Sequence, residues 1–201
     1  MIASMRYKQI SIIIVVAALS ACAQEPELLN SERIEQRFGS YGVEILSYEA
    51  GVRRSSLYSV HNNTQVCRTY AVVRFIDDNI ASIADAHANV VAGQSIGATF
   101  KSAGWQINKV TIHIGSLTLS DTNHSIGQLM RLEQPAELAV HAYQFVLQKD
   151  DHEIDYATII ETHHPDYLSV EDLRGLYGKS LEADLSDDEI RNLSTLIMDM
   201  D

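Results

Sequence analysis

The chain has 201 residues, of which 46% are hydrophobic, and its formal net charge is −12. This length and apolar content suit one globular domain with a substantial core. The acidic balance argues against nucleic acid as a partner and against an electrostatic membrane patch, because both need clustered lysine and arginine.

The N-terminal segment has the order of a secretory signal. Two basic residues precede an apolar run over 10–19, and small residues follow it. The run is too short to span a bilayer, which takes about 20 apolar residues. It ends in Leu-Ser-Ala-Cys at 19–22, which resembles the lipobox of bacterial lipoproteins. The resemblance implies removal of residues 1–21 as a signal peptide and acylation of Cys22, with palmitate among the expected lipids.

The position after this cysteine bears on which membrane holds the anchor. Among Gram-negative lipoproteins an Asp there commonly signals inner-membrane retention, and here the residue is Ala23. The resemblance therefore implies an outer-membrane anchor facing the periplasm, if the host is Gram-negative. Residues 22–29 would be the lipidated cysteine and its tether, and residues 30–201 a single domain. The expected partners are the membrane, through the lipid, and another protein of the envelope.

Hydrophobic periodicity and turn residues predict alternating groups of helices and strands. Strands are expected at 43–49, 56–61, 66–76, 105–119, 137–148 and 153–163, and helices at 31–39, 80–92, 96–103, 124–131, 169–177 and 186–199. The strand at 105–119 alternates most clearly, with Val110 and Ile112 on one face and Lys109 and Thr111 on the other. This pattern predicts a sheet with one solvent-exposed face.

Short turns between the strands favour antiparallel pairing. One of them is expected at 51–54, between the first two strands. The predicted class is α+β, with a mainly antiparallel sheet of about five to six strands and helices packed on one side.

The C-terminal 20 residues are strongly acidic, with a net charge of −6 over 182–201. Ser186 and Glu189 are typical of a capping box, and acidic charge near a helix N-terminus suits the helix dipole. We expect a solvated acidic helix, and the alternative is a docking tail for a basic partner.

Cys67 is the second of two cysteines and has no intrachain partner if Cys22 is lipidated. Alternation along its strand places it on a mostly apolar face with Thr69, Ala71 and Val73. We therefore expect a buried, unreactive thiol.

The densest group of potential metal ligands consists of Glu161, His163, His164 and Asp166. On a strand, Glu161 and His163 point to one face and His164 to the other, and Pro165 keeps His164 extended. A zinc site needs three or four converging ligands. We therefore interpret this segment as a polar strand end with local hydrogen bonds, and we assign no metal site to it.

A metal centre would need a further ligand from a neighbouring strand, and the best candidates are His141 and His152. A second pattern, Gly-Gln-Ser-Ile-Gly at 93–97, matches the nucleophile elbow of serine hydrolases. That elbow needs a strand before the serine. Here a helix is predicted before it, so Ser95 is expected to be the N-cap of the helix at 96–103.

These observations favour a non-enzymatic envelope lipoprotein that acts as a binding or structural module. We assign no catalytic residue, and no phosphate loop, Rossmann glycine pattern or CxxC motif predicts a cofactor. The alternative hypothesis is a metal-dependent hydrolase that uses the cluster at 161–166. A serine hydrolase at Ser95 is a third and weaker hypothesis.

Overall fold

The computed structural model describes residues 28–76, 81–178 and 187–199 of the chain. Cys22, the expected signal peptide and most of the tether lie outside the described residues, as does Ser186 of the expected capping box. Within the described ranges, no helix is both long enough and apolar enough to cross a membrane.

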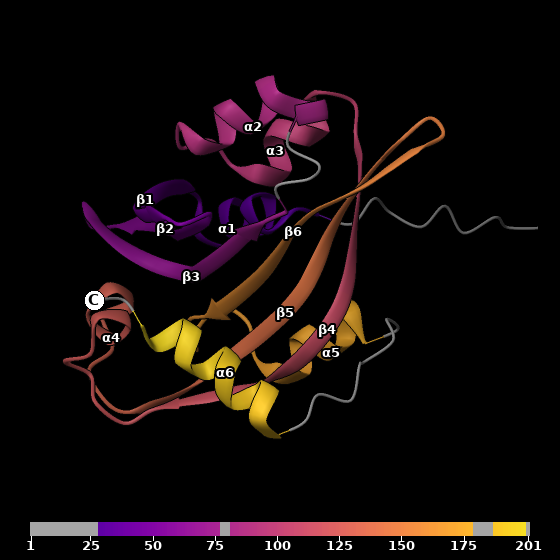
Figure 1. The fold of residues 1–201 in the computed structure, drawn as a ribbon. Helices are drawn as coiled ribbons and strands as arrows, with labels where there is room; N and C mark the ends of the chain where they lie inside the picture. Colours follow the sequence, from indigo (N-terminus) through magenta and orange to yellow (C-terminus); the bar gives the residue numbers. More distant parts are fainter. Residues whose placement is uncertain (1–27, 77–80, 179–186, 200–201) are drawn as a thin grey trace, which may run out of the picture.

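Six strands form one antiparallel sheet with the order β1-β2-β3-β6-β5-β4 (Figure 1). The strands are β1 (Gly42–Glu49), β2 (Val52–His61), β3 (Thr64–Phe75), β4 (Gln106–Leu119), β5 (Ala136–Lys149) and β6 (His152–His163). Each half of the sheet is a meander of three strands, and β3 pairs with β6 where the halves meet. The expected α+β class and antiparallel sheet are confirmed.

Two-residue turns close the hairpins of the first meander. Ala50 and Gly51 have φ values of 49° and 75°, and Asn62 and Asn63 have 49° and 60°. Two successive positive φ angles are typical of the type I′ turn, which matches the twist of antiparallel strands. The first turn therefore consists of Ala50 and Gly51, and the predicted turn at 51–54 extends too far into the next strand. As a consequence, Arg53 belongs to strand β2.

Helices cover both faces of the sheet, which corrects the expectation of one covered side (Figure 1). One face carries α1 (Asn30–Phe38), α2 (Ala84–Val91), α3 (Ile96–Ser102) and α5 (Val170–Tyr177), and the other carries α4 (Ser125–Met130) and α6 (Asp187–Met198). We call them the α1 face and the α6 face.

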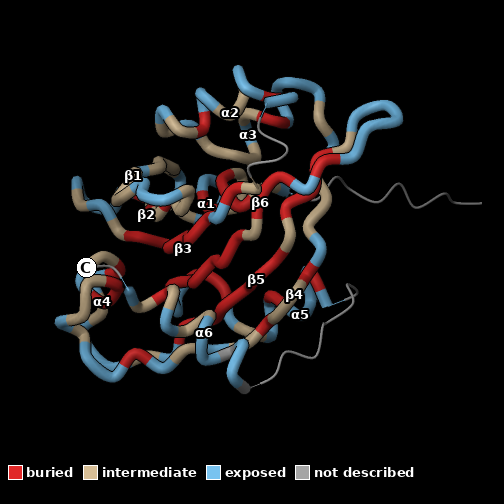
Figure 2. The backbone as a smooth tube through the Cα atoms, viewed as in Figure 1, coloured by how far each residue is buried: buried red, intermediate tan, exposed pale blue. Residues whose placement is uncertain are grey.

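The central strands explain why both faces need cover. On β3, Val73 shares a core cluster with Phe100 of α3. Its neighbour Val72 points the other way and shares a cluster with Ile197 of α6. Figure 2 shows long buried stretches along β3, β5 and β6. Strands with apolar residues on both sides require a layer on both sides.

A bulge in β3 changes the face on which Cys67 lies. Arg68 is an extra residue between Cys67 and Thr69, and an extra residue reverses the alternation beyond it. Cys67 therefore joins Val72 on the α6 face, so the expected face was wrong. The expected burial is confirmed, because the residue is 1% exposed and burial raises the pKa of its thiol to about 12.

Candidate functional site

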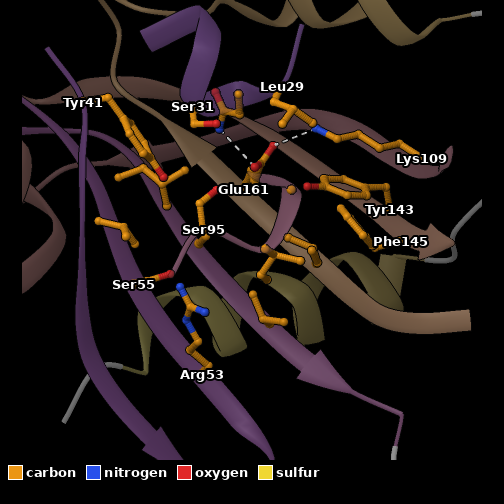
Figure 3. Close-up of a pocket in the computed structure, with 18 residues that line it drawn as sticks. Leu29, Ser31, Tyr41, Arg53, Ser55, Ser95, Lys109, Tyr143, Phe145 and Glu161 are labelled. Atoms are coloured by element: carbon orange, nitrogen blue, oxygen red, sulfur yellow. Dashed lines mark hydrogen bonds and ion pairs between the residues drawn. The ribbon is translucent and has the colours of Figure 1, made fainter. Parts of the chain in front are cut away.

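A cavity of about 60 Å³ lies between the α1 face of the sheet and helices α1 and α3 (Figure 3). On this scale one water molecule takes about 10–15 Å³, so the cavity holds about four to six non-hydrogen atoms. Most of its wall is apolar: Leu29, Val43, Leu57, Ala71, Val73, Ile96, Phe145 and Ile159. Figure 3 shows Glu161 and Lys109 at one end and Arg53 and Ser55 at the other.

Glu161 is the buried carboxylate of this cavity and is 5% exposed. Asn30 Nδ2 donates a hydrogen bond to its Oε1 at 3.0 Å, and Lys109 Nζ lies 3.9 Å from its Oε2. Burial alone would raise the pKa of Glu161, but Lys109, two histidines and the Asn30 hydrogen bond outweigh burial and hold it below its usual value. The side chain is therefore an ionised carboxylate at neutral pH.

The Asn30 side chain connects helix α1 to the sheet. Tyr167 Oη donates to Asn30 Oδ1 at 2.6 Å, and Asn30 Nδ2 donates to Thr69 Oγ1 at 3.2 Å as well as to Glu161. Thr69 Oγ1 is 3.0 Å from His163 Nδ1. Which of these two atoms donates depends on the tautomer of the imidazole. The other ring nitrogen, Nε2, is 4.0 Å from Glu161 Oε2.

Aromatic rings surround the Lys109 ammonium. Its Nζ lies 4.6 Å from the ring centre of Tyr143 and 5.3 Å from that of Tyr177, within cation–π range. His141 stacks on Tyr177 at 4.4 Å. Burial lowers the pKa of His141 to about 3 and that of His163 to about 4, so both imidazoles are neutral at pH 7. The charges at this end of the cavity are therefore Lys109 and Glu161.

Arg53 supplies the charge at the other end and is 2% exposed. Its Nη1 donates to the carbonyl oxygens of Val90 at 2.9 Å and Gln94 at 3.3 Å, at the C-terminal end of α2. Its buried Nε has no hydrogen-bond partner, and none of the ion pairs within the described residues includes Arg53. The cavity wall thus holds two cations and one carboxylate.

The structure brings together only part of the predicted metal cluster. Glu161 and His163 share the α1 face, and His141 of β5 is directly opposite Glu161 in the strand register. His164 turns away and its Nδ1 accepts from the Asp166 amide at 3.0 Å, while the Asp166 carboxylate is 78% exposed. Among the described residues, no group of three or more His, Cys, Asp or Glu side chains is placed to hold a metal ion.

The other two predicted candidates, His152 and Ser95, do not join a metal site or a nucleophile elbow. His152 is exposed at the hairpin end of β6, far along the strand from His163. Ser95 precedes α3 with extended backbone, at φ −63° and ψ 127°, as expected of an N-cap, although its side chain makes no capping hydrogen bond. Helix α2, and no strand, comes before Ser95, so the nucleophile-elbow geometry is missing. Ser95 instead lines the cavity.

Sequence reasoning missed Lys109 and Asn30 as members of this site, and it placed Arg53 in a turn. Lys109 was placed on the wet face of its strand, yet its side chain is 10% exposed whereas Val110 is 49% exposed. A bulge between Thr111 and His113 reverses the alternation midway along β4. The run of strand-forming residues after Gly51 could have shown that Arg53 belongs to a strand and not to a turn.

No protein-family model, curated protein or solved structure matches this chain. Its function is therefore argued from the site.

Proposed function

We propose that the mature chain is an envelope lipoprotein, anchored by a lipid on Cys22, whose domain is a non-enzymatic binding module for a small molecule. The observation that supports binding is the cavity, in which an apolar wall separates charged groups at two ends. Small-molecule sites typically combine such a wall with a few convergent polar groups.

The chemistry of the buried groups favours binding over catalysis. A general base works best when its pKa lies near the operating pH, and burial keeps the pKa values of His141 and His163 far below 7. The Glu161 carboxylate already pairs with Lys109 and accepts a hydrogen bond from Asn30. Among the described hydrogen bonds, none joins Ser95 Oγ to a histidine. These groups can hold a ligand, but they do not form a nucleophile–base pair.

The proposed anchor would keep the cavity close to the bilayer. Leu29 lines the cavity, and the chain from Cys22 to Leu29 spans at most about 25 Å when fully extended. The cavity would therefore stay near the membrane surface, where it could collect a small molecule from the periplasm.

The anchor is tested by intact-mass analysis and membrane fractionation of the full chain. The wild type should begin at Cys22, carry a lipid and fractionate with membranes. Cys22→Ser should abolish acylation and leave unprocessed or soluble protein, whereas the matched variant Cys67→Ser should keep the lipid. Retention of residues 1–21, or an unmodified Cys22 in the wild type, would refute the anchor.

The binding function is tested by thermal unfolding with a panel of small acids, amines and neutral molecules. Ala71 lines the cavity and is 4% exposed, so Ala71→Val should fill part of it without adding a polar group. A binding module should show at least one compound that raises Tm in the wild type and less in Ala71→Val. If no compound distinguishes the two proteins, a purely structural role replaces the binding function.

A further inference from the structure

We propose that the ligand of this cavity is a short-chain monocarboxylate whose carboxylate binds Arg53. This inference rests on the binding function proposed above and assigns its ligand class. It starts from a buried guanidinium that lacks a counter-ion within the described structure. A buried charge costs several kcal/mol unless it is paired and hydrogen-bonded. A bound anion would remove that cost.

The hydrogen bonds of Arg53 leave an N–H group for the ligand. Nη1 is taken by the carbonyls of Val90 and Gln94, which hold the guanidinium plane in place. The buried Nε–H remains without an acceptor on a side chain that lines the cavity. Hydrogen bonds between a guanidinium and a carboxylate are short and strong because both groups are charged. A carboxylate is therefore the natural acceptor for this N–H.

Hydroxyl groups complete the anion-binding end. Ser55 lies two residues from Arg53 on the same face of β2 and is 1% exposed. Figure 3 shows its hydroxyl beside the guanidinium, with Ser95 and Tyr41 also facing the cavity. Burial raises the pKa of Tyr41, so its hydroxyl stays protonated and can donate. Hydroxyl donors next to a cation suit a carboxylate, and the positive charge of Arg53 repels an ammonium group.

The charge balance limits the ligand to one negative charge. The wall has one positive charge in excess, because Lys109 and Glu161 compensate each other and Arg53 is left over. A second carboxylate reaching the far end would meet Glu161. Between the two ends the wall is apolar, and the volume admits about four to six non-hydrogen atoms. Acetate, propionate and butyrate have this size, this charge and an alkyl part.

The experiment is isothermal titration of the full lipidated chain in detergent at pH 7. Propionate is the probe, and its matched controls are neutral propionamide, cationic n-propylammonium and inorganic phosphate. A hydrogen bond between charged groups is worth about 1.5–3 kcal/mol, so propionate should bind at least about tenfold more tightly than each control.

Two variants test whether the carboxylate of propionate binds at Arg53. Arg53→Lys keeps the charge but loses Nε–H, and it should weaken propionate binding by about tenfold. Arg74→Lys, at an exposed arginine on the neighbouring strand β3, should bind like the wild type. Because Arg53 also supports α2, Ala71→Val is the second test: it leaves Arg53 intact and should reduce propionate binding by filling the cavity.

The outcomes separate this inference from the binding function. If propionamide, n-propylammonium or phosphate binds as well as propionate, and Ala71→Val removes that binding, the cavity is a binding site but the carboxylate assignment is wrong. If folded Arg53→Lys or Ala71→Val binds propionate like the wild type, the assignment is also wrong. If no probe binds the folded wild type, the monocarboxylate proposal is overturned, and the wider panel then decides the binding function.

Discussion

The two faces of the sheet bury different kinds of side chain, although they belong to the same strands. On β6, Ile160 packs into the apolar core of the α6 face, and its neighbour Glu161 is a buried carboxylate on the α1 face. Apolar burial stabilises a domain directly, whereas buried charges are retained only when partners compensate them. The α6 face therefore mainly holds the fold together. The α1 face gives up part of that stability for a cavity with buried charged groups at its ends.

Removing the carboxylate of the α1 face should have the largest effect. Glu161→Ala removes the carboxylate that lies 3.9 Å from the buried Lys109 ammonium and accepts a hydrogen bond from Asn30. Losing one member of a buried pair costs about 3–5 kcal/mol, so the free energy of unfolding should fall by about that amount in a denaturant titration. Glu153→Ala, at an exposed glutamate of the same strand, should change it by less than about 0.5 kcal/mol. Similar small values for both variants would contradict the compensating role of Glu161.

Acid should destabilise the protein through the α1 face. Burial lowers the pKa of His163 to about 4 from an ordinary 6.5, so the unfolded chain binds a proton more readily between these values. Stability is therefore complete above pH 6.5 and is lost as the pH falls through about 4. His163 alone should contribute about 3 kcal/mol to this loss.

Denaturant titrations at pH 7.5 and pH 5 measure the first part of that loss, about 2 kcal/mol for His163. His163→Gln should reduce the difference between the two pH values, and His152→Gln, at an exposed position of the same strand, should not. His141 acts in the same direction, because burial lowers its pKa to about 3. The same free energy of unfolding at both pH values would mean that these histidines are solvated.

The fold was largely predictable because its signals are local. Ser169 and Asp172 form the capping box that opens α5, with the serine oxygen accepting from the Asp172 amide at 3.1 Å. Asn62 and Asn63 supply the positive φ angles of their hairpin. Such features depend on a few adjacent residues, so sequence reasoning recovers the type and approximate bounds of each element.

The candidate site was less predictable because it depends on register and bulges. The convergence of Glu161 and His163 follows from simple alternation, and His141 was rightly named as a neighbour. The burial of Lys109 could not be predicted, because a bulge reverses the alternation of side chains midway along β4. Nothing local marks an extra residue in a strand, since its cause is the packing on both faces.

The α6 face contains one polar group that should be expendable. Thr162 is fully buried there, and its Oγ1 has no hydrogen-bond partner. Thr162→Val keeps the shape and removes an unsatisfied hydroxyl, so it should stabilise the protein by about 1 kcal/mol. Thr158 of the same strand donates to Gln144 at 3.1 Å, and Thr158→Val should instead destabilise by about 0.5–1.5 kcal/mol. Destabilisation by Thr162→Val, measured in the same denaturant titrations, would show that its hydroxyl is satisfied.

Metal should have the smallest effect of all. The Lys109 ammonium already lies 3.9 Å from Glu161 Oε2 and provides its counter-charge. His163 Nδ1 already lies 3.0 Å from Thr69 Oγ1, within hydrogen-bond distance. A metal ion at Glu161 would have to displace the lysine. We therefore expect chelator or zinc to shift Tm by less than about 1 °C, a change worth under about 0.5 kcal/mol for a domain of this size.

A true site would give a much larger response in the same thermal unfolding experiment. Zinc at one hundred times its Kd adds about 2.7 kcal/mol, which corresponds to a rise in Tm of about 5–10 °C. Such a rise, abolished by His163→Ala, would support the metal-dependent hydrolase with Glu161, His163 and His141 as ligands. Lys109→Gln sharpens the test, because it removes the competing cation and leaves the three candidate ligands in place. If zinc stabilises Lys109→Gln but not the wild type, the lysine is what keeps metal out of the α1 face.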